Sequence, residues 1–454
     1  MESRRLARRT VLSAIATSFA AAVGASVLGA CGGATPAPTV GPEGEATAAA
    51  APSGGERTEE AFTIEVLVDF SPEYLAFVDE NITPLLKEMY PNATVENLPL
   101  DWNRLEEQLL TTKAGGSMPD LYRMGAAFVP LAALNGLAIV LDDRLDEWGV
   151  RDDFLKASLT TCQWEGKTWG LPQLTSPRHY CYRKDLADEA GVTIADDWDW
   201  DAYLEAAIAC TVHDGTKVVR MGSSCHMDRQ EWLGVLYSGG GMVVKDGKAG
   251  FNNEAGVWSL SWLKERNNTI TPQGYAPLPD SPIPYLATGQ WVIAYGHPGN
   301  HAVNVRRHAP DKLQFVTVPQ PPMKARRVAK TNTDWIAIGV TSKHPDAAWE
   351  LLKLHMSPEA LIAYNQDIGY LPPRQSAFEQ AEYLQEPLMQ KVISNMRNYG
   401  EPQPLYPSWA KLNRVLQPMV EAAILGTKTI EQALAEAETE TNTIMAEYPN
   451  WPDV

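Results

Sequence analysis

The sequence has few of the residues that build metal and redox sites. Its 454 residues include five cysteines and eight histidines, and no two cysteines have the C-x-x-C spacing of a zinc or thiol–disulfide site. The histidines are scattered without paired spacing, which argues against a metal centre. Four cysteines follow Cys31, namely Cys162, Cys181, Cys210 and Cys225. One or two disulfides are open to them outside the cytoplasm, and the sequence selects no pairing.

Signatures of nucleotide binding and of common hydrolases are also missing. Gly115-Gly116 belongs to neither a G-x-G-x-x-G loop nor a P-loop with its lysine. No G-x-S-x-G, H-E-x-x-H or Cys–His signature marks an active site. A formal net charge of −18 disfavours nucleic acid or an anionic lipid surface as the ligand. We therefore expect no cofactor, no metal and no nucleic-acid partner.

Residues 1–30 predict an export signal rather than a part of the fold. Arg8-Arg9-Thr10-Val11-Leu12 is similar to a twin-arginine signal, and an apolar run follows it. Leu28-Gly29-Ala30-Cys31 resembles a bacterial lipobox, in which the cysteine thiol receives a diacylglycerol. A transmembrane anchor is the alternative, but glycine and serine dilute the apolar run. A lipidated and acylated Cys31 would tether the protein at a membrane face.

Residues 31–61 predict a disordered tether, because they are rich in Ala, Pro, Gly, Thr and Glu and cannot bury a core. The chain beyond them is longer than one hydrophobic core usually organises, so we expect two lobes. The N-terminal lobe is placed at residues 62–174 plus 331–370. The C-terminal lobe is placed at residues 175–330 plus 371–454.

The N-terminal lobe is predicted to alternate strands and helices. Phe62–Phe70 is an apolar, β-rich strand, Ser71-Pro72 begins a helix, and Thr94–Leu98 is the next strand. Asp101 is expected to cap another helix, which a glycine break separates from a short strand at Tyr122. This order predicts an α/β fold with a mostly parallel sheet and helices on both faces. Ligands of such sheets bind beyond the carboxyl ends of the strands.

The stretch Trp164–Leu186 is interpreted as the first crossing between the lobes. Glu165-Gly166-Lys167 predicts a hairpin turn. Gly170-Leu171-Pro172 is expected to break the strand, because proline cannot donate to a central ladder. A second strand at His179–Arg183 then leads into a helix that begins at Lys184-Asp185.

The C-terminal lobe and the returning chain show further start and stop signals. The predicted helices are Trp200–Cys210 capped by Asp199, Arg229–Leu236, Asn253–Glu265 capped by Asn252, and helices beginning at Pro345, Ser357-Pro358 and Thr429, the last with a capping box. The predicted strands are Trp291–Tyr295, Phe315–Val318 and Thr333–Val340, with a loop at Gly296–Asn300.

Several stretches resemble one protein family. Thr111–Leu121 is similar to the "asG-x-x-PD-hydrophobic" stretch of the extracytoplasmic solute-binding proteins of ABC importers. Glu165–Pro172, together with Tyr182–Leu186, is similar to the "GK-x-Y-G-x-P … Y-N-K-D-L" stretch of the same proteins. The resemblance is to the carbohydrate-binding family 1, which includes maltodextrin-binding protein. Arg183 departs from the usual Asn. Further matching stretches are Phe251-Asn252, Ala287–Ala294, His344–Leu352 and Gly369–Arg374.

The resemblance implies a two-lobe periplasmic-binding-protein-like fold of type II, in which each lobe is a mostly parallel sheet flanked by helices. Three hinge crossings are expected near Leu171–Thr175, Ala329–Thr333 and Tyr370–Arg374. The lobes would close around a sugar or oligosaccharide, and the receptor, expected to be a monomer, would deliver it to ABC importer permease subunits.

Sugars present C–H patches that aromatic rings cover and hydroxyls that polar side chains satisfy. Fourteen tryptophans suit such a surface, although tryptophan is also a common core residue. Trp258 and Trp262 have helical spacing and are assigned to the core. The resemblance places His297 or Asn300 at a ligand contact, and the alternative for His297 is a solvated loop residue. The predicted ligand-binding residues are Asp69, Phe70, Trp102, Arg123, Ser176, His179, Trp232, His297, Asn300, Asp334, Trp335, Tyr370, Arg374, Tyr406 and Trp409.

Two other functions are kept as alternatives. An exported glycoside hydrolase would need facing carboxylates, for which Asp69 and Asp334 are candidates. A receptor for a cationic amine or another small polar solute is the other alternative, and an amine would suit an acidic, aromatic-rich chain. A peptide- or metal-binding receptor is disfavoured by the histidine spacing and the aromatic content.

Overall fold

A computed structural model describes residues 60–102, 104–274, 276, 278–406 and 409–448. From Glu60 onward these residues belong to one compact unit. The predictions for the export signal, for lipidation of Cys31 and for nearly all of the tether lie outside the described residues. In the described part of the chain, no helix is both long enough and apolar enough to cross a bilayer.

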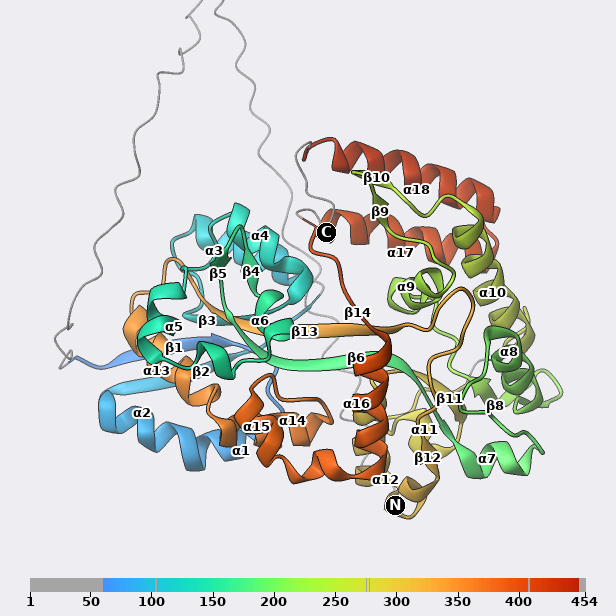
Figure 1. Cartoon of the computed structure of the whole chain (residues 1–454), viewed down its shortest axis with the longest axis horizontal. Coiled ribbons are helices and arrows are strands. Elements are labelled where there is room, and N and C mark those ends of the chain that lie inside the picture. The colour runs from blue at the N-terminus through green and yellow to red at the C-terminus, as the bar shows by residue number, and fades with distance from the viewer. Residues whose placement is uncertain (1–59, 103, 275, 277, 407–408, 449–454) are drawn as a thin grey trace, which may run out of the picture. The chain divides into compact units, whose positions relative to one another are not determined.

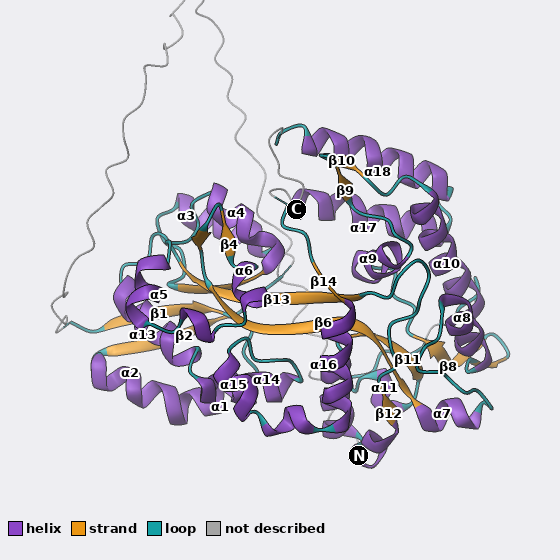
Figure 2. Ribbon diagram, viewed as in Figure 1, coloured by secondary structure: helices purple, strands orange, loops and turns teal. Residues whose placement is uncertain are grey.

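The main sheet has the strand order β2-β1-β3-β13-β6-β11-β8-β7, with β12 added to β6 and β14 to β13. In Figures 1 and 2, β6 and β13 are long neighbouring strands through its middle. Its strands are β1 (Phe62–Leu67), β2 (Ala93–Leu98), β3 (Leu121–Gly125), β6 (Leu171–Arg183), β7 (Val212–Asp214), β8 (Lys217–Ser223), β11 (Trp291–Gly296), β12 (Val316–Thr317), β13 (Ala329–Ile338) and β14 (Gly400–Pro402). Two small hairpins pair β4 (Gln163–Trp164) with β5 (Lys167–Thr168) and β9 (Val244–Lys245) with β10 (Lys248–Ala249).

The strand directions divide the sheet into unlike parts. β1 runs parallel to both β2 and β3, as the predicted alternation of strands and helices requires. β13 is antiparallel to both β3 and β6, and β11 is parallel to β8 but antiparallel to β6. The prediction of a mostly parallel sheet is therefore confirmed for β1–β3 and wrong for the strands around β6, which form a mixed sheet.

Helices surround the sheet, as Figure 2 shows. They are α1 (Pro72–Phe77), α2 (Thr83–Met89), α3 (Leu105–Ala114), α4 (Val129–Leu134), α5 (Asp142–Trp148), α6 (Lys156–Thr160), α7 (Lys184–Glu189), α8 (Trp200–Ala209), α9 (Arg229–Ser238), α10 (Glu254–Ile270), α11 (Tyr285–Thr288), α12 (Pro298–His308), α13 (Pro345–His355), α14 (Pro358–Ile368), α15 (Gln375–Gln380), α16 (Pro387–Tyr399), α17 (Trp409–Leu425) and α18 (Ile430–Met445). A π-helical turn at Val78–Ile82 joins α1 to α2, and 3₁₀ turns lie at Ala126–Phe128, Arg151–Asp153, Pro310–Phe315 and Glu382–Gln385.

Several local signals in the sequence are confirmed. The Ser71 hydroxyl accepts from the Tyr74 amide and caps α1, and Asp199 caps α8 in the same way. Thr429 and Gln432 form the predicted capping box of α18. The hairpin between β4 and β5 turns at Glu165 (φ 50°) and Gly166 (φ 73°). Each of these signals depends only on residues close together in the chain.

Pro172 does not break the chain as predicted. It lies inside β6, opposite Trp335, where the register with β13 shifts between Asp334 and Trp335. Such an irregularity in the ladder accommodates a residue that has no N–H to donate.

Three predicted boundaries are also wrong. Asp101 does not cap α3: its carbonyl accepts from Arg104 in a turn, and the helix begins one residue later. The Asn252 side chain donates to Glu438 of α18, so the next residue, Asn253, caps α10 instead. The predicted loop Gly296–Asn300 is divided between two elements: Gly296 ends β11, and α12 begins at Pro298, whose place at the first helical position favours helix initiation.

The hydrophobic core forms separate clusters toward the two ends of β6. Leu171 and Leu174 pack with Ile64 and Ile336 in one cluster, and Tyr180 packs with residues of α8–α10 in another. This separation agrees with two lobes that share β6 and β13. The lobe boundaries and the hinge remain predictions, and Ala377 of α15 still packs with the N-terminal cluster.

Candidate ligand-binding site

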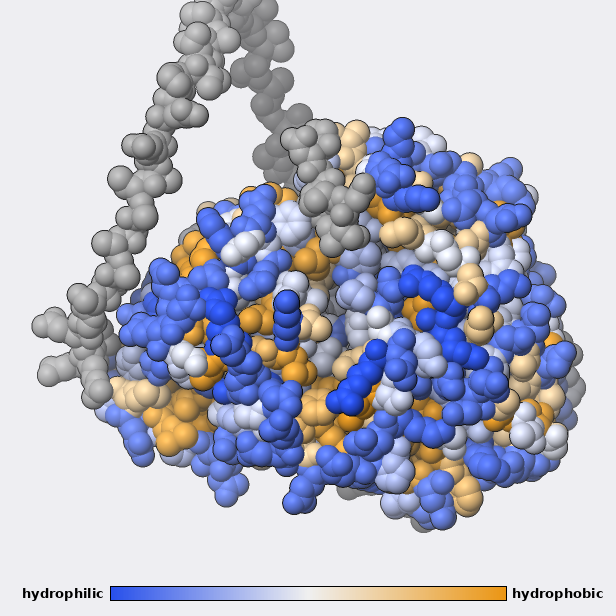
Figure 3. All heavy atoms as spheres, viewed as in Figure 1, coloured by the Kyte–Doolittle hydropathy of each residue, from blue (hydrophilic) through white to orange (hydrophobic). Residues whose placement is uncertain are grey.

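The predicted site residues that come together do so at one cavity of about 380 Å³. It lies where β1 and β3 end, beside the middle of β6 and β13, and faces the first residues of α9 and α17. The face of the molecule in Figure 3 is largely hydrophilic, with hydrophobic patches scattered over it. Another cavity, of about 320 Å³, is lined by α12, α14 and residues 383–389 but contains none of the predicted residues. We therefore take the first cavity, hereafter the cleft, as the candidate site.

One wall of the cleft is built on an arginine between two carboxylates. Arg123 of β3 binds Asp69 at 2.6 Å and Asp334 of β13 at 2.7 Å, and also donates to the Tyr364 hydroxyl. Burial alone would lower the pKa of the Arg123 guanidinium, but Tyr364, Asp334 and Asp69 outweigh burial and raise it. Arg123 therefore stays charged. It neutralises much of the acidic wall and holds both carboxylates in place to accept hydrogen bonds.

Aromatic rings lie at three places on the lining. Trp102 is 42% exposed, donates from Nε1 to Asp69 (3.2 Å), and covers the Arg123 guanidinium at 5.6 Å. Tyr370 packs against the His297 ring, with centroids 4.8 Å apart. Trp409, in the first turn of α17, is almost fully buried but still contributes to the lining. These rings offer flat apolar surface between polar groups.

The facing wall carries basic and amide side chains. Arg178 of β6 donates to Nε2 of His297 (2.8 Å), so Nδ1 of His297 holds the ring proton and faces the Ser176 hydroxyl (2.9 Å). Burial, followed by the nearby Arg178 and His301, lowers the pKa of His297 well below its ordinary value. His297 is therefore neutral and serves to orient Arg178.

Two more cations lie beside Arg178. Arg229, the first residue of α9, donates from Nε to Asn413 (2.7 Å). Lys330 of β13 is fully buried behind the wall and donates to the side-chain oxygens of Gln230 and Gln403. Since an ammonium group only donates, both amide oxygens face Lys330 and the two NH₂ groups remain to be donated elsewhere.

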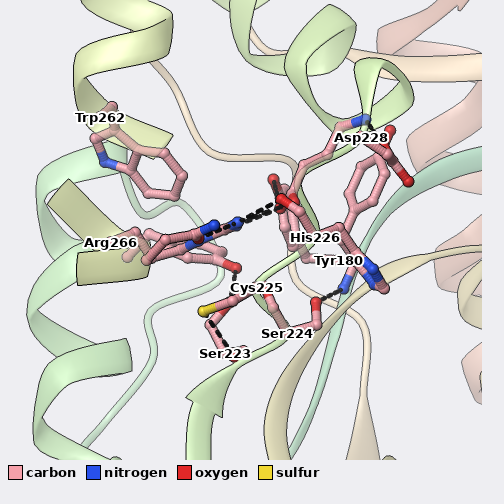
Figure 4. A network of polar contacts seen from close by, with 12 residues as sticks. Tyr180, Ser223, Ser224, Cys225, His226, Asp228, Trp262 and Arg266 are labelled. Carbon is pink, nitrogen blue, oxygen red and sulfur yellow. Dashed lines mark hydrogen bonds and ion pairs between the residues drawn. The ribbon is translucent and has the colours of Figure 1, made fainter. Parts of the chain in front are cut away.

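A buried ion pair holds α9 in position behind this wall. Figure 4 shows Arg266 of α10 reaching from beside Trp262 toward Tyr180 and the neighbourhood of Asp228. Arg266 donates through both terminal nitrogens to the carboxylate of Glu231 in α9, and its Nη2 lies 3.0 Å from Oε2. Both side chains have 0% exposure. The Tyr180 hydroxyl donates to the same carboxylate (3.1 Å). Because Glu231 lies two residues after Arg229, this network fixes the helix start that lines the cleft.

The structure brings about half of the predicted ligand-binding residues to the lining. These are Asp69, Trp102, Arg123, His297, Asp334, Tyr370 and Trp409. His297 lies on the lining as the N-cap of α12 and not in a loop, and its contact with a ligand stays a prediction.

Strand alternation explains two of the misplaced residues. Successive side chains of a strand point to opposite faces, so His179 is turned away from the face on which Arg178 lines the cleft. Burial lowers the pKa of His179 to about 3. Trp335 likewise lies on the face opposite to Asp334, fully buried, and donates to the Gly125 carbonyl (2.9 Å).

The other misplaced residues have structural partners elsewhere. Trp232 is a core residue with 0% exposure that donates to Ser259, and Tyr406 stacks on Trp409. The remaining four also lie outside the lining. Phe70 packs on Tyr74 and His355, and Asn300 donates to the Ile368 carbonyl. Arg374 binds Asp153, and the Ser176 hydroxyl faces Nδ1 of His297.

Sequence reasoning missed Arg178, Arg229, Gln230, Gln403 and Asn413. Arg178 lies in the middle of a strand, and the others are surface-type residues in segments far apart in the sequence. No motif marks them. The only available signal was the position of Arg178 in the predicted crossing, between Pro177 and His179.

The described chain shows how its cysteines are used. Cys162, Cys181, Cys210 and Cys225 are free thiols, so neither of the disulfides left open by the sequence is formed among them. Within the residues that the structure describes, no group of three or more His, Cys, Asp or Glu side chains is arranged to hold a metal ion.

Comparison with known proteins decides the family. The sequence profile of the bacterial extracellular solute-binding proteins matches residues 85–391. The chain belongs to this family. It is therefore an extracellular solute-binding protein and not an enzyme, as we expected from the family resemblance and the missing hydrolase signatures.

Individual relatives of this solute-binding protein are distant but match over most of their length. The diacetylchitobiose binding protein DasA of Streptomyces coelicolor is 22% identical over 361 residues, 76% of this chain and 81% of DasA. A solute binding protein of an ABC transporter from Thermotoga lettingae, bound to alpha-D-tagatose, superposes with a TM-score of 0.73 at 20% identity, over 85% of this chain and 100% of that one. The GacH receptor of Streptomyces glaucescens also gives 0.73, at 19% identity, over 86% and 100%. These structures confirm the periplasmic-binding-protein fold.

Proposed function

We propose that this solute-binding protein is a lipid-anchored extracytoplasmic receptor that binds a sugar or oligosaccharide in the cleft and delivers it to an ABC importer. The observation that carries the proposal is the composition of the cleft, in which the rings of Trp102, Tyr370 and Trp409 alternate with charged and amide side chains. Rings cover the C–H faces of a sugar, and the polar groups satisfy its hydroxyls. A cavity of about 380 Å³ is of the size that holds a small ligand.

The similar proteins support this reading. DasA is named for diacetylchitobiose, the Thermotoga protein holds tagatose, and GacH was solved with acarbose and an acarbose homolog. All three ligands are sugars or sugar-like. Delivery to permease subunits, and a working monomer, follow from the same family likeness.

Closure of two lobes is the motion that we propose for binding. The lobes are residues 62–174 plus 331–370 and residues 175–330 plus 371–454. β6 takes part in the cores of both, and β13 pairs with β6 along the crossing. Closing them would exclude water from the cleft and strengthen each polar contact with the ligand. Lipidation of Cys31 would keep the receptor at the membrane face.

The site favours this function over the alternatives. Asp69 and Asp334 share the Arg123 guanidinium, which suits hydrogen-bond acceptors better than an acid and a nucleophile of a hydrolase. A cationic amine would meet Arg178 and Arg229 on the facing wall, a repulsion that disfavours that ligand.

A thermal-shift screen followed by calorimetry tests the proposal. Mono- and oligosaccharides are added to the purified chain from residue 60 onward, and a sugar ligand is expected to raise the melting temperature by mass action. Trp102→Ala is expected to weaken its binding by a factor of about 5 to 100, because removing a stacking ring costs on the order of 1–3 kcal/mol. Trp102→Phe, which keeps a ring, should recover part of the affinity.

Leu134→Ala provides the matched control. Leu134 is 53% exposed on α4 and is absent from the lining of the cleft, so its truncation should leave the affinity unchanged. The proposal fails if no saccharide raises the melting temperature, or if both truncations affect binding equally.

A further inference from the structure

We propose that the ligand is an acidic saccharide, whose anionic group binds between Arg178 and Arg229 on the basic wall of the cleft. The inference rests on the proposed function and narrows it from sugars in general to sugars that carry a carboxylate or a similar oxyanion. Arg178, Arg229 and Lys330 lie together here, two of them on the lining and the third directly behind it.

The three cations have amide or imidazole partners where a protein normally supplies carboxylates. Arg178 donates to His297, Arg229 to Asn413, and Lys330 to two glutamines. Among the described residues, none of the three forms an ion pair, and the Nε of Arg178 is buried without a hydrogen-bond partner. Charged donors in a partly buried site are costly unless an anion satisfies them.

The lack of carboxylate partners at the basic wall is unusual for a chain as acidic as this one. The sequence holds 56 acidic side chains and only 38 Lys and Arg, so carboxylates are plentiful, and Arg123 on the opposite wall has two of them. Asp228 is the acidic group near the basic wall, but its side chain accepts from the Glu231 amide (2.8 Å) and caps α9. A structural cluster would have been neutralised within the protein, whereas this one is left open to the cleft.

Mutual repulsion among these groups points the same way. Burial is the main cause that lowers the pKa of Lys330 well below its ordinary value, and the nearby Arg178 lowers it further. Burial and Arg178 also lower the pKa of Arg229, although Asp228 acts in the opposite direction. An anion placed between the arginines would remove this repulsion. Guanidinium groups bind carboxylates through paired hydrogen bonds.

The amide groups around the arginines suit the sugar that carries the charge. The oxygens of Gln230 and Gln403 are occupied by Lys330, which leaves NH₂ donors at the lining. On the opposite wall, Asp69 and Asp334 supply acceptors. A saccharide with its anionic group on the basic wall would place its hydroxyls between these donors and acceptors.

Isothermal titration with matched saccharides tests this proposal. Galacturonic acid and digalacturonate are compared with galactose and a neutral galactose disaccharide, and galactose 6-phosphate is added as a second oxyanion. We expect the acidic members to bind about tenfold or more tightly than their neutral counterparts, the equivalent of one charge-assisted hydrogen bond. Raising the salt concentration should reduce this preference. If the phosphate binds and the uronates do not, the proposal stands with phosphate as the anionic group.

Variants locate the anion. Arg229→Gln is expected to weaken binding of the acidic saccharide about tenfold, and Arg229→Lys to restore part of the loss. Arg220→Gln is the control, because Arg220 contacts the exposed Glu189 away from the cleft. Circular dichroism verifies the fold of each variant. The preference of the unmodified protein for acidic over neutral saccharides does not depend on any variant and therefore tests the proposal independently.

The outcomes separate this proposal from the proposed function. Equal or tighter binding of the neutral saccharides overturns the acidic ligand and leaves the sugar receptor standing. An unchanged affinity in a folded Arg229→Gln variant overturns the assigned position. Binding of none of these saccharides overturns the acidic ligand, and the broader thermal-shift screen then decides the sugar receptor separately.

Discussion

Neutralising Glu231 is expected to destabilise the protein strongly, because it leaves a charged arginine in the interior. Glu231 and Arg266 both have 0% exposure, and the carboxylate accepts from two nitrogens of Arg266 and from the Tyr180 hydroxyl. In Glu231→Gln the amide oxygen replaces one acceptor, but the negative charge is lost. Arg266 then keeps Asn267 (3.0 Å) and the Trp262 ring as partners.

The size of the effect follows from these contacts. Breaking a buried ion pair by removing one charge costs about 3–5 kcal/mol, and the remaining partners of Arg266 place the expected loss near 3 kcal/mol. With an unfolding entropy of about 2 cal/mol/K per residue, such a loss corresponds to a fall in melting temperature of about 4 °C for a unit of this length. The double variant Glu231→Gln/Arg266→Met should recover part of the loss, since it removes the unpaired charge.

Urea unfolding followed by tryptophan fluorescence measures these differences. Arg220→Gln serves as the surface control, because Glu189 is 63% exposed and the pair is 3.4 Å apart; exposed pairs contribute about 0–1 kcal/mol. The reasoning would be refuted if Glu231→Gln cost no more than this control. If the double variant were less stable than Glu231→Gln, the attribution of the loss to the unpaired arginine would be wrong.

Two further predictions concern pH and backbone contact. Burial lowers the pKa values of His301 and His355 to about 4, so these histidines are protonated at a higher pH in the unfolded chain than in the folded protein. The contribution of the two neutral histidines to the free energy of unfolding is therefore full above about pH 6.5 and is lost as the pH falls toward 4. At pH 5 the expected loss is on the order of 2 kcal/mol per histidine. Equal unfolding free energies at pH 7 and pH 5 would contradict this. Gly299→Ala would bring a Cβ to 2.0 Å from the Gly369 carbonyl oxygen, and we expect a loss of about 1–3 kcal/mol in chemical unfolding. Gly234 lies in α9, and a Cβ there would have its nearest neighbour, the Tyr295 hydroxyl oxygen, at 3.7 Å. Gly234→Ala should therefore be neutral or stabilising by up to about 1 kcal/mol. Similar losses in both variants would show that the close approach at Gly299 is unimportant.

Much of the local structure could be predicted from short stretches. Ser71, Asp199 and Thr429 cap their helices as expected, and Glu165-Gly166 forms its hairpin turn. Such features depend on side chains and amides a few residues apart, so the sequence contains all of the interacting groups. The prediction for Pro172 failed because the ladder irregularity that accommodates it is formed with β13, more than a hundred residues away.

The candidate site was predictable in part. Asp69 and Arg123 were chosen because they lie at or near the ends of β1 and β3, where α/β sheets bind ligands, and both reach the lining of the cleft. Asp334 was chosen at a predicted strand start, but it lies in the middle of β13 and reaches the lining from there. Tryptophan identity could not separate the exposed Trp102 from the fully buried Trp232, since an indole suits both a core and a binding surface.

The sequence alone determined the alternation of strands and helices in the N-terminal part, the helix caps at Ser71, Asp199 and Thr429, and the family to which the chain belongs. Only the tertiary structure decided which charges find partners. Arg123 meets two carboxylates from distant strands, whereas Arg178 and Arg229 meet a histidine and an asparagine. The physical reason is that ion pairing acts over a few ångströms in space, and spacing along the chain does not reveal which segments the fold brings that close.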